Sequence, residues 1–536
     1  MRIAVVGGGP GGLFFATLLR RADPATEVTV FERNKPDDTF GFGVVFSDRT
    51  LAGIHEADPV LRKALAEHGT HWDDIEVRLK GERLRCGGNG MAAIVRKTLL
   101  SLMQQRAGEV GADLRFATEV RLSDLDGYDL VVAADGTGSL IREGLTADLG
   151  VEVDTATAKF IWFGTDHVFD SLTFLHERGP HGVFAVHAYP ISEDVSTFIV
   201  ETDEESWQRA GLDEFDVSRP PGVSDLASRD YLQTLFAEHL DGHRLLVNNS
   251  RWGNFRTRRS RTWHSLDPRP VALLGDAVHT AHFSVGSGTK MAMEDAVALS
   301  AALAAHPGDL EAALTAYEAA AQPSVRRIQD SARPSLAWWE HFGSYYEHFE
   351  PWQFAYHFFT RSISDARLAR RAPELAGASH REWVTRHGAE PLDTPFEHRG
   401  WTSPTRAVAV VTQHEVPATV LTGGRPLALT ERAPDRADGE PWGARVAAPE
   451  TEQGLAGAHR LLAELADHHP AVAAVHGGTS LTRSLLCERA RLRHRLPALL
   501  VDPALDADQA ATAVLSGRAD LVGVPVAVLR EWGVPA

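Results

Sequence analysis

The opening residues constrain the fold of this 536-residue chain more than any other segment. A short apolar run from Ile3 to Val6 leads directly into Gly7, Gly9 and Gly12 in the pattern G-x-G-x-x-G, and apolar residues with helical spacing follow. A continuous apolar strand is typical of a sheet that is buried on both faces. Glycines at these positions let the backbone turn tightly and approach a pyrophosphate at a helix N-terminus. The pattern predicts a strand–turn–helix unit that binds a dinucleotide.

A second predicted strand supplies the acid that such a unit uses. The segment "EVTVFER" (27–33) ends in Glu32 and Arg33. An acid about 20 residues after the glycines accepts hydrogen bonds from the ribose of the nucleotide. The glycine pattern alone also occurs in ordinary strand–turn–helix units, but the strand, the helix and Glu32 together favour a dinucleotide. Arg33 is expected beside the same ligand.

Two further predicted strands end in a turn that combines an acid with a glycine. The first turn, in "LVVAADGTGSLIRE", contains Asp135 and Gly136. The second turn, in "VALLGDAVHTAHFSVGSGTK", contains Gly275 and Asp276. Because one dinucleotide needs only one pyrophosphate turn, three turns on separate strands indicate an extended ligand that is contacted in several places.

These turns resemble those of the group A flavoprotein monooxygenases, a family that binds FAD. Other segments resemble the branch of salicylyl-CoA 5-hydroxylases and 2-aminobenzoyl-CoA monooxygenases. The usual family turn has Pro and Asn where this chain has Phe283 and Lys290. The segments that resemble the branch are "FGFGVVFSD" (40–48), "HAYPISEDVSTFIVE" (187–201) and "HTAHFSVGSGTK" (279–290).

The resemblance implies an α/β fold: a Rossmann-like FAD-binding part of the PHBH type with a β-sheet substrate domain, together spanning 1–390. FAD-binding parts are expected at 1–155 and 265–330, the substrate sheet at about 80–95 and 155–265, and a helical, aromatic segment at 330–390. The residues expected to contact FAD are Gly7, Gly9, Gly12, Glu32, Arg33, Arg96, Asp135, Gly136, Ser139, Arg142, Gly275, Asp276, Gly286, Gly288 and Thr289.

The resemblance also implies the reaction. FAD, reduced by NADH or NADPH, would activate O2 as a flavin C4a-hydroperoxide and hydroxylate an electron-rich ring. A base that removes a phenol proton is expected to be a histidine, and His282 and His187 are the first candidates, with Tyr189 beside them. His279 and His282 are equally explained as hydrogen-bonded turn or core histidines. The sequence contains no G-x-S-x-G, H-E-x-x-H or Walker pattern.

An arginine-rich segment bears on the substrate. In "SRWGNFRTRRSRTWH" (250–264), five arginines suit the phosphates of coenzyme A, because guanidinium groups grip phosphate oxygens in pairs. A solvated, charge-balanced strand edge is the alternative. Lys290 either binds substrate or is an exposed residue; a cation at a helix N-terminus favours an acidic neighbour such as Glu294. The candidate substrate-binding residues are Phe46, Asp48, Arg256, Arg258, Arg259, Arg261 and Lys290.

The favoured substrate is salicylyl-CoA, hydroxylated to gentisyl-CoA. The alternatives are 2-aminobenzoyl-CoA, a free phenolic acid, an aryl thioester on a carrier protein, and a non-redox binding protein on the same fold. The aromatic stretch 338–356 is expected to form a packed helical lid or the surface of a homodimer. Residues 394–536 resemble parts of an old-yellow-enzyme-type flavin barrel but are too few for about 250 residues of a full barrel. A degenerate, partial TIM-barrel-like domain without FMN is expected there, with a loop at 423–450.

Composition excludes several classes. The net charge of −18 disfavours nucleic acid and anionic membrane as partners. Cys86 and Cys487 form neither a disulfide framework nor a metal-binding spacing, so no metal site is expected. The chain opens without a cleavable leader and contains no apolar stretch of transmembrane length. A cytoplasmic enzyme is expected.

Overall fold

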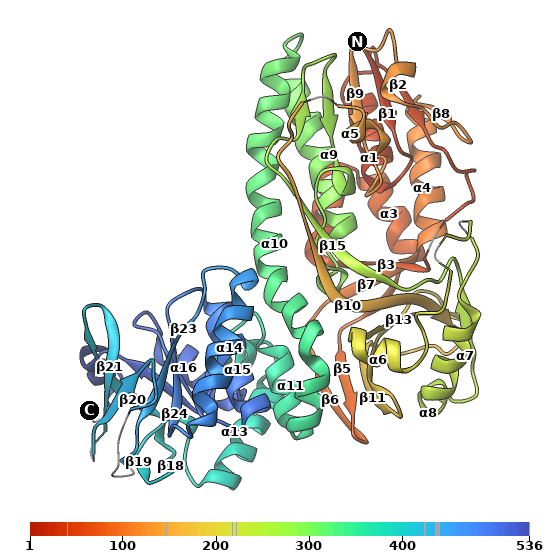
Figure 1. Ribbon diagram of the computed structural model, residues 1–536. Helices are drawn as coiled ribbons and strands as arrows, with labels where there is room; N and C mark the ends of the chain where they lie inside the picture. The colour runs from red at the N-terminus through yellow and green to blue at the C-terminus, as the bar shows by residue number, and fades with distance from the viewer. Residues whose placement is uncertain are drawn as a thin grey trace. The chain divides into compact units, whose positions relative to one another are not determined.

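The computed structural model describes residues 1–39, 41–145, 147–216, 218–220, 222–422, 425–434 and 440–534 (Figure 1). The chain divides into two compact units. The first contains Met1–Arg83 and Gly87–Gly343, and the second contains Leu84–Cys86 and Ser344–Ala536. The main division thus falls at Gly343, earlier than the boundary expected between residues 390 and 394. The helices after Gly343 belong with the tail, since the Asp365 N–H donates to Thr512 Oγ1 over 2.8 Å.

A six-stranded sheet forms the dinucleotide-binding part of the first unit. Its strands lie in the order β16 (His264–Ser265), β17 (Val271–Leu273), β9 (Leu130–Ala133), β1 (Arg2–Val6), β2 (Glu27–Phe31) and β8 (Asp113–Arg115). Apart from β16, neighbouring strands are parallel. Parallel strands end at the same edge of a sheet. The turns that follow β1, β9 and β17 are therefore neighbours, as the three-turn interpretation requires.

Helices pack against this sheet (Figure 1). The first begins at Pro10, whose fixed φ suits the first helical position, directly after Gly9. It packs against the helix that begins at Gly288, and the approach is so close that a Cβ on Gly11 would lie 3.1 Å from Ala292 O on that helix. The helices of this part are α1 (Pro10–Ala22), α4 (Arg96–Glu109), α5 (Leu140–Glu143) and α9 (Gly288–Ala305).

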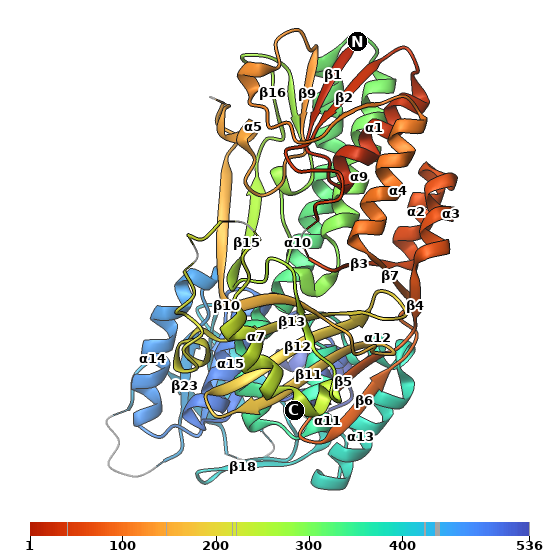
Figure 2. The same ribbon diagram turned by 90° about the vertical axis from the view of Figure 1, so that its right-hand side faces the viewer.

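A larger sheet forms the expected substrate part. Its strands lie in the order β14 (Leu245–Val247), β10 (Val151–Thr165), β13 (Ser196–Thr202), β12 (Gly182–Pro190), β11 (Leu172–Gly179), β5 (Ile75–Leu79) and β6 (Glu82–Cys86), and β15 (Gly253–Ser260) pairs with β10. Side chains alternate between the two faces of a strand. On one face, Phe184, Val186 and Ala188 share an apolar core with the helices shown beside the sheet in Figure 2. His187 and Tyr189 lie on the opposite face. The covering helices are α6 (Glu204–Arg209), α7 (Leu226–Leu235) and α8 (Ala237–Leu240).

The remaining elements of the first unit are a small sheet and a long helix. α10 (Leu310–His348) carries buried Trp338, Trp339 and Phe342. These rings contact His176, on the same sheet face as His187, and Trp339 stacks on that imidazole at 6.0 Å. This part of the aromatic segment is a packed helix. The small sheet has the order β3 (Gly43–Ser47), β7 (Met91–Val95) and β4 (Thr70–Trp72), and it is accompanied by α2 (Asp48–Ala57) and α3 (Pro59–His68).

The second unit contains a closed barrel, whereas the sequence indicated a partial one. Within the described residues its strands are β20 (Ala407–Gln413), β21 (Val416–Leu421), β22 (Leu427–Thr430), β23 (Gly443–Ala447), β24 (Val472–His476), β25 (Ala498–Val501) and β26 (Leu521–Val524), and β26 pairs back with β20. The first three strands are antiparallel. Direct connections there replace strand–helix units, so the barrel closes with fewer residues than a full (β/α)₈ barrel.

The prediction of a loop at 423–450 is wrong for two segments of that range. β22 and β23 form within it, and Leu427, Leu429 and Val446 are buried. Flanking Pro, Gly and charged residues hid these short strands in the sequence. Residues 423–424 and 435–439 lie outside the described residues. The other elements of the unit are α11 (Pro351–Phe359), α12 (Asp365–Arg371), α13 (Pro373–His387), β18 (Phe396–His398), β19 (Trp401–Ser403), α14 (Leu455–Asp467), α15 (Ser480–His494), α16 (Ala507–Leu515) and α17 (Val526–Glu531).

Hydropathy adds one finding. Within the described parts of the chain, no helix combines the length and the apolar character needed to cross a membrane.

Candidate active site

The glycines of the first turn serve two different purposes. Gly7 has φ +111°, and a Cβ there would lie 2.2 Å from Ala134 O. A Cβ on Gly12 would lie 2.2 Å from Gly7 O, so both positions exclude any larger residue. Gly9 is different, because no atom lies within 4 Å of its Cβ position. Packing therefore explains two of the glycines, and open space over the third fits the approach of a pyrophosphate.

Glu32 is fixed at this turn. Its Oε2 accepts the Gly8 N–H over 2.8 Å, and its Oε1 accepts the backbone N–H and the side-chain amide of Asn34, each over 2.8 Å. The carboxylate thus stands at the end of β2 beside the glycines, where a ribose would meet it. Arg33 is exposed and makes no hydrogen bond or ion pair that involves the described residues.

The second and third turns are joined by Arg142. Its guanidinium donates to Ala277 O over 2.7 Å and to Thr137 O over 3.0 Å. Ser139 caps the short helix by accepting the Arg142 N–H over 3.0 Å. Asp135 Oδ2 accepts the Ile141 N–H, while its buried Oδ1 accepts no hydrogen bond from the described residues. Gly136, with φ +80°, has nothing within 4 Å of its Cβ position.

Asp276 and Arg96 carry opposite charges in the same region. Burial raises the pKa of the Asp276 carboxyl, and the positive groups of His279, Arg96 and Arg258 oppose that rise. Burial lowers the pKa of Arg96, whose Nε has no hydrogen-bond partner among the described residues. An orphaned guanidinium N–H and an orphaned carboxylate oxygen on Asp135 fit a ligand that carries both phosphate and hydroxyl groups. These residues fit FAD.

The turn at Gly275 is braced by a residue that the sequence analysis missed. Asp295 Oδ2, on α9, accepts the Gly275 N–H over 2.9 Å and lies 2.7 Å from His279 Nε2. Both side chains are nearly inaccessible to solvent. His279 is thus a hydrogen-bonded turn histidine, the alternative considered above. An acid on the buried side of a predicted helix was the signal that could have identified Asp295.

The segment at the start of α9, residues 286–290, contains small residues. Gly286, with φ +61°, and Gly288 have no atom within 4 Å of their Cβ positions. Thr289 lies in the first turn of α9, next to Lys290. Lys290 Nζ forms an ion pair with Glu294 at 2.6 Å, one helical turn further on. Glu294 is therefore the acidic neighbour that the helix position favoured.

His187, Tyr189 and His282 come together on the inner face of the larger sheet. Phe283, at the position of the usual family proline, packs against this surface, with its ring centroid 5.4 Å from His187, 4.3 Å from His282 and 5.5 Å from Trp162. Tyr189 stacks on Trp72 at 6.0 Å, and burial raises the pKa of its hydroxyl. The two candidate bases and Tyr189 thus share a dry, aromatic surface.

A buried carboxylate lies between the two histidines. Glu201 Oε1, on β13, is 3.1 Å from His187 Nε2 and 3.8 Å from His282 Nε2. Glu201 is only 1% exposed. It occurred within the segment used for the family resemblance, but the sequence analysis assigned it no role. Alternation along β13, which places Glu201 on the same face as Ile199 and Thr197, was the signal available.

The expected substrate residues do not all reach this surface. Phe46 packs in the core around the six-stranded sheet, whereas Tyr189 and Phe283 belong to a separate apolar cluster on the larger sheet. Asp48 is the first residue of α2 and lies against Gly90. A Cβ on Gly90 would be only 2.3 Å from Asp48 Oδ2. Both residues sit where they stabilise local packing, because β3 is a core strand that leads directly into a helix.

The arginine cluster is divided by the alternation of β15. Arg256 and Arg258 share one face, and Arg258 donates to Asp276 O over 3.1 Å. Arg259 lies on the other face and lines a small hollow together with His282. Arg261 pairs with Asp148 at 3.1 Å, and Arg251 donates to three backbone carbonyls. The structure therefore does not bring the five arginines together.

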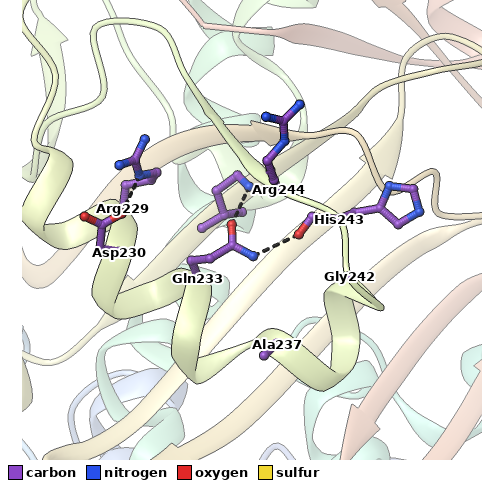
Figure 3. Close-up of a pocket in the computed structure, with 8 residues that line it drawn as sticks. Arg229, Asp230, Gln233, Ala237, Gly242, His243 and Arg244 are labelled. Atoms are coloured by element: carbon purple, nitrogen blue, oxygen red, sulfur yellow. Dashed lines mark hydrogen bonds and ion pairs between the residues drawn. The ribbon is translucent and has the colours of Figure 1, made fainter.

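A surface pocket lies on the other side of the sheet (Figure 3). It is formed by α7 and α8, which pack on the face opposite to His187, and by the sheet's own strand β14. Gln233 holds it together, donating to His243 O over 2.8 Å and accepting the Leu245 N–H over 2.7 Å. The pocket is separate from the three turns. Its lining residues are Arg229, Asp230, Gln233, Ala237, Gly242, His243, Arg244 and Leu245.

Comparison with known proteins bears on this site. The family model described as "FAD binding domain" matches residues 1–332. The chain is 55% identical over 529 residues to a Salicyloyl-CoA 5-hydroxylase from a Streptomyces species, covering 98% of this chain and 99% of that protein. It is 38% identical over 338 residues to 3-hydroxy-4-methyl-anthranilyl-[aryl-carrier protein] 5-monooxygenase from Streptosporangium sibiricum, covering 63% and 89%.

The fold also matches a solved structure. The tetrameric form of 2-methyl-3-hydroxypyridine-5-carboxylic acid oxygenase aligns with a TM-score of 0.51 and 19% identity, covering 68% of this chain and 98% of that one. This similarity concerns the fold alone.

A glycine-rich turn beside Glu32, two acid–glycine turns at the same sheet edge, and a second sheet with a dry aromatic surface define an FAD-dependent oxidoreductase. The chain belongs to the FAD binding domain family, among the group A flavin monooxygenases. The family, the α/β fold and the FAD cofactor predicted from the sequence are confirmed.

Proposed function

We propose that the protein hydroxylates the aromatic ring of an aryl-CoA thioester, converting salicylyl-CoA to gentisyl-CoA with O2 and NADH or NADPH. The observation that carries the proposal is the 55% identity, over 98% of the chain, to a Salicyloyl-CoA 5-hydroxylase. FAD, when bound, supplies the oxygen-activating chemistry that amino-acid side chains lack. The residues of the chain have to bind FAD and the substrate, orient the aromatic ring and remove the proton of its hydroxyl.

The three turns are proposed to hold the cofactor. Gly9 leaves space for the pyrophosphate, Glu32 accepts hydrogen bonds from the ribose, and Arg96 offers its unpaired Nε to a phosphate oxygen. Asp276 stands where the sugar chain would pass, and its turn is fixed by Asp295. Gly286 and Gly288 would allow the backbone to approach the flavin ring.

The inner face of the larger sheet is proposed to receive the aromatic ring. Trp162, Phe283 and Tyr189 would exclude water from it, which strengthens every electrostatic interaction inside the site. His187 and His282 lie on this surface within reach of Glu201. A phenolic hydroxyl placed there would meet the ionisable groups that we propose to take part in proton transfer.

Arg256 is proposed to contact the coenzyme A part of the substrate. It is exposed, and it shares a strand face with Arg258, which is already committed to the third turn. An exposed guanidinium beside the cofactor-binding turn suits a phosphate that remains outside the dry part of the site. Arg259, beside His282, is proposed to contact the thioester end.

A second candidate is an aryl thioester carried by a protein. The Streptosporangium sibiricum relative is named for an aryl-carrier protein substrate. The two candidates share the thioester chemistry and differ in whether the carrier is a nucleotide or a folded domain. Acyl-CoA thioesters and reduced nicotinamide nucleotides are metabolites of the cytoplasm, so the proposal includes a cytoplasmic enzyme. Whether the protein forms a homodimer stays a prediction.

The experiment is a comparison of substrates on the purified flavoprotein. NADH and NADPH oxidation and hydroxylated product are measured with salicylyl-CoA, 2-aminobenzoyl-CoA, free salicylate and salicylyl-carrier protein. We expect kcat/KM for salicylyl-CoA to exceed that for salicylate at least ~100-fold, with 5-hydroxylated product. Equal turnover of free salicylate would overturn the thioester part of the proposal, and preference for the carrier-bound form would support the second candidate.

A further inference from the structure

We propose that Glu201 is the proton acceptor of the site: its carboxylate takes the proton of the substrate's ring hydroxyl, and His187 and His282 hold and direct it. This inference rests on the proposed function, because it requires a hydroxylated aromatic substrate. It concerns a residue outside the candidate bases that the sequence analysis named.

The orientation of His282 excludes it as the first acceptor. The backbone N–H of Ser284 donates to His282 Nδ1 over 3.3 Å, and the Ser284 hydroxyl lies 2.8 Å from the same nitrogen. A neutral imidazole that accepts at Nδ1 carries its proton on Nε2. That nitrogen faces Glu201 Oε1 at 3.8 Å. In this state the protonated nitrogen of His282 is the one nearest Glu201, at a distance too long for a hydrogen bond, and the imidazole has no available lone pair for a substrate proton.

Glu201, in contrast, has oxygen atoms that are available to accept a proton. Both of its carboxyl oxygens are buried, and neither accepts a hydrogen bond of good geometry from the described residues. An ionised carboxylate can accept several hydrogen bonds, and a buried one without them is destabilised. His187 Nε2 approaches Oε1 to 3.1 Å from the neighbouring strand. The carboxylate is thus the acceptor in the cluster, and each imidazole presents Nε2 to it.

The surroundings of Glu201 allow its carboxylate to accept a proton near neutral pH. Burial raises the pKa of its carboxyl to about 7; the imidazole of His282 opposes the rise and Glu340, on α10, adds to it. Glu340 itself lies 3.8 Å from Arg333 Nη2. On β11, His176 lies on the same sheet face; burial lowers its pKa to about 3, so it stays neutral. A base works best when its pKa lies near the working pH.

The proton transfer balances without a further reactant. The O–H bond of the substrate breaks, its electron pair stays on the ring oxygen, and the proton forms a new O–H bond on Glu201. One negative charge moves from the carboxylate to the ring, so the charge of the buried site is unchanged. The ring becomes more electron-rich, which is the property that aromatic hydroxylation requires.

The test is the pH dependence of hydroxylation, with the binding of FAD and of salicylyl-CoA measured separately. The rate at which the reduced flavoprotein hydroxylates bound salicylyl-CoA after mixing with O2 is followed against pH. In E201Q, which removes the proton acceptor but keeps the size, we expect the rate at pH 7 to fall at least tenfold and the midpoint of the pH–rate profile to rise by at least one pH unit, because the phenol must then lose its proton to solvent. E201D retains a carboxylate and should recover at least half of the shift.

A matched control is available on the same sheet. Glu177 pairs with His239 at 3.2 Å, but it points to the other face, so E177Q should leave the midpoint unchanged. H187Q carries the same expectation as E201Q and provides the test if E201Q does not retain FAD. An unchanged midpoint in both E201Q and H187Q, with salicylyl-CoA still bound and hydroxylated, overturns the role of Glu201. Absence of binding and hydroxylation in the unmodified protein would instead overturn the proposed function.

Discussion

His279 and Asp295 lie 2.7 Å apart beneath the turn that carries Asp276, and the same Asp295 oxygen accepts the Gly275 N–H. The pair therefore connects α9 to the third cofactor-binding turn. Because both side chains are nearly inaccessible to solvent, their hydrogen bonds are stronger than exposed ones, and the loss of one partner leaves the other unsatisfied. The position of Asp276 depends on this contact.

D295N should consequently weaken cofactor binding. The amide keeps the shape of the side chain but removes the charge that favours two hydrogen bonds. We expect a loss of about 1–3 kcal/mol in stability and a rise of roughly tenfold in the Kd for FAD. Flavin fluorescence titration and thermal unfolding measure the two effects. The control is D309N, since Asp309 caps α10 from an exposed position where Asn is an equally good cap. Unchanged FAD affinity in D295N would contradict the assignment.

The two kinds of glycine in the first turn make a sharper prediction. Gly9 has φ −78°, which alanine tolerates, and no protein atom near its Cβ position. G9A should fold with unchanged apoprotein stability while its FAD affinity falls at least ~10-fold, because the methyl group occupies the ligand's space. G12A should not fold stably, because its Cβ would meet a backbone oxygen.

G53A is the matched control for G9A. Gly53 lies in α2, away from the cofactor turns, and also has open space at its Cβ position. Alanine there should leave FAD binding unchanged and raise stability by about 0.5–1 kcal/mol, because glycine is a poor helix former. Apoprotein unfolding and FAD titration on all three variants give the comparison. A G9A variant that binds FAD normally would show that the space over Gly9 is not used.

The local parts of the site could be predicted from the sequence, and the contacts between distant segments could not. The glycines of the first turn and the acids at Glu32, Asp135 and Asp276 follow strands directly, so short-range patterns identify them. Glu201 and Asp295 act on groups from other elements, and only the folded chain shows those contacts.

Two expectations about the substrate side differ from the observed placement for another reason. Phe46 was expected beside the substrate, but it packs in the core around the six-stranded sheet, as apolar side chains in short strands commonly do. The arginines at 256–261 are adjacent in sequence, yet alternation along a strand places them on two faces. The division of the arginines between two faces could have been predicted from the sequence. The closure of the barrel could not, because it depends on antiparallel strands whose pairing no local pattern specifies.

The barrel unit contains a histidine that should make stability depend on pH. His380 lies 3.0 Å from Asp365 and 2.9 Å from Glu390. The hydrogen bond to Asp365 and then that to Glu390 raise the pKa of His380 to about 9, against the effect of burial. An unfolded histidine has a pKa of about 6.5, so folding favours the protonated form. The stabilisation is complete below pH ~6.5 and is lost as the pH rises through 9.

H380Q measures that contribution. The variant should be less stable than the unmodified protein by about 1–2 kcal/mol at pH 6, after allowance for solvent screening of a half-buried group. The difference should shrink steadily up to pH 9.5. Chemical unfolding of the full chain at several pH values is the measurement, and H468Q, at an exposed histidine after α14, is the control. A difference that grows with pH would reverse the sign and contradict the assignment.

Arg256 provides the last prediction, which depends on the coenzyme A proposal. Its exposed guanidinium has no hydrogen-bond or ion-pair partner among the residues that the structure describes, in contrast to Arg261, which pairs with Asp148. R256A should raise the Kd for salicylyl-CoA by roughly 3- to 10-fold, and the effect should diminish with added salt because an exposed charge pair is screened. R261A should change the Kd less than twofold. Binding of free salicylate should be the same in both variants, since it lacks the phosphates. Equal effects of R256A on salicylyl-CoA and on salicylate would place Arg256 at the ring rather than at the nucleotide and would overturn its assignment to coenzyme A.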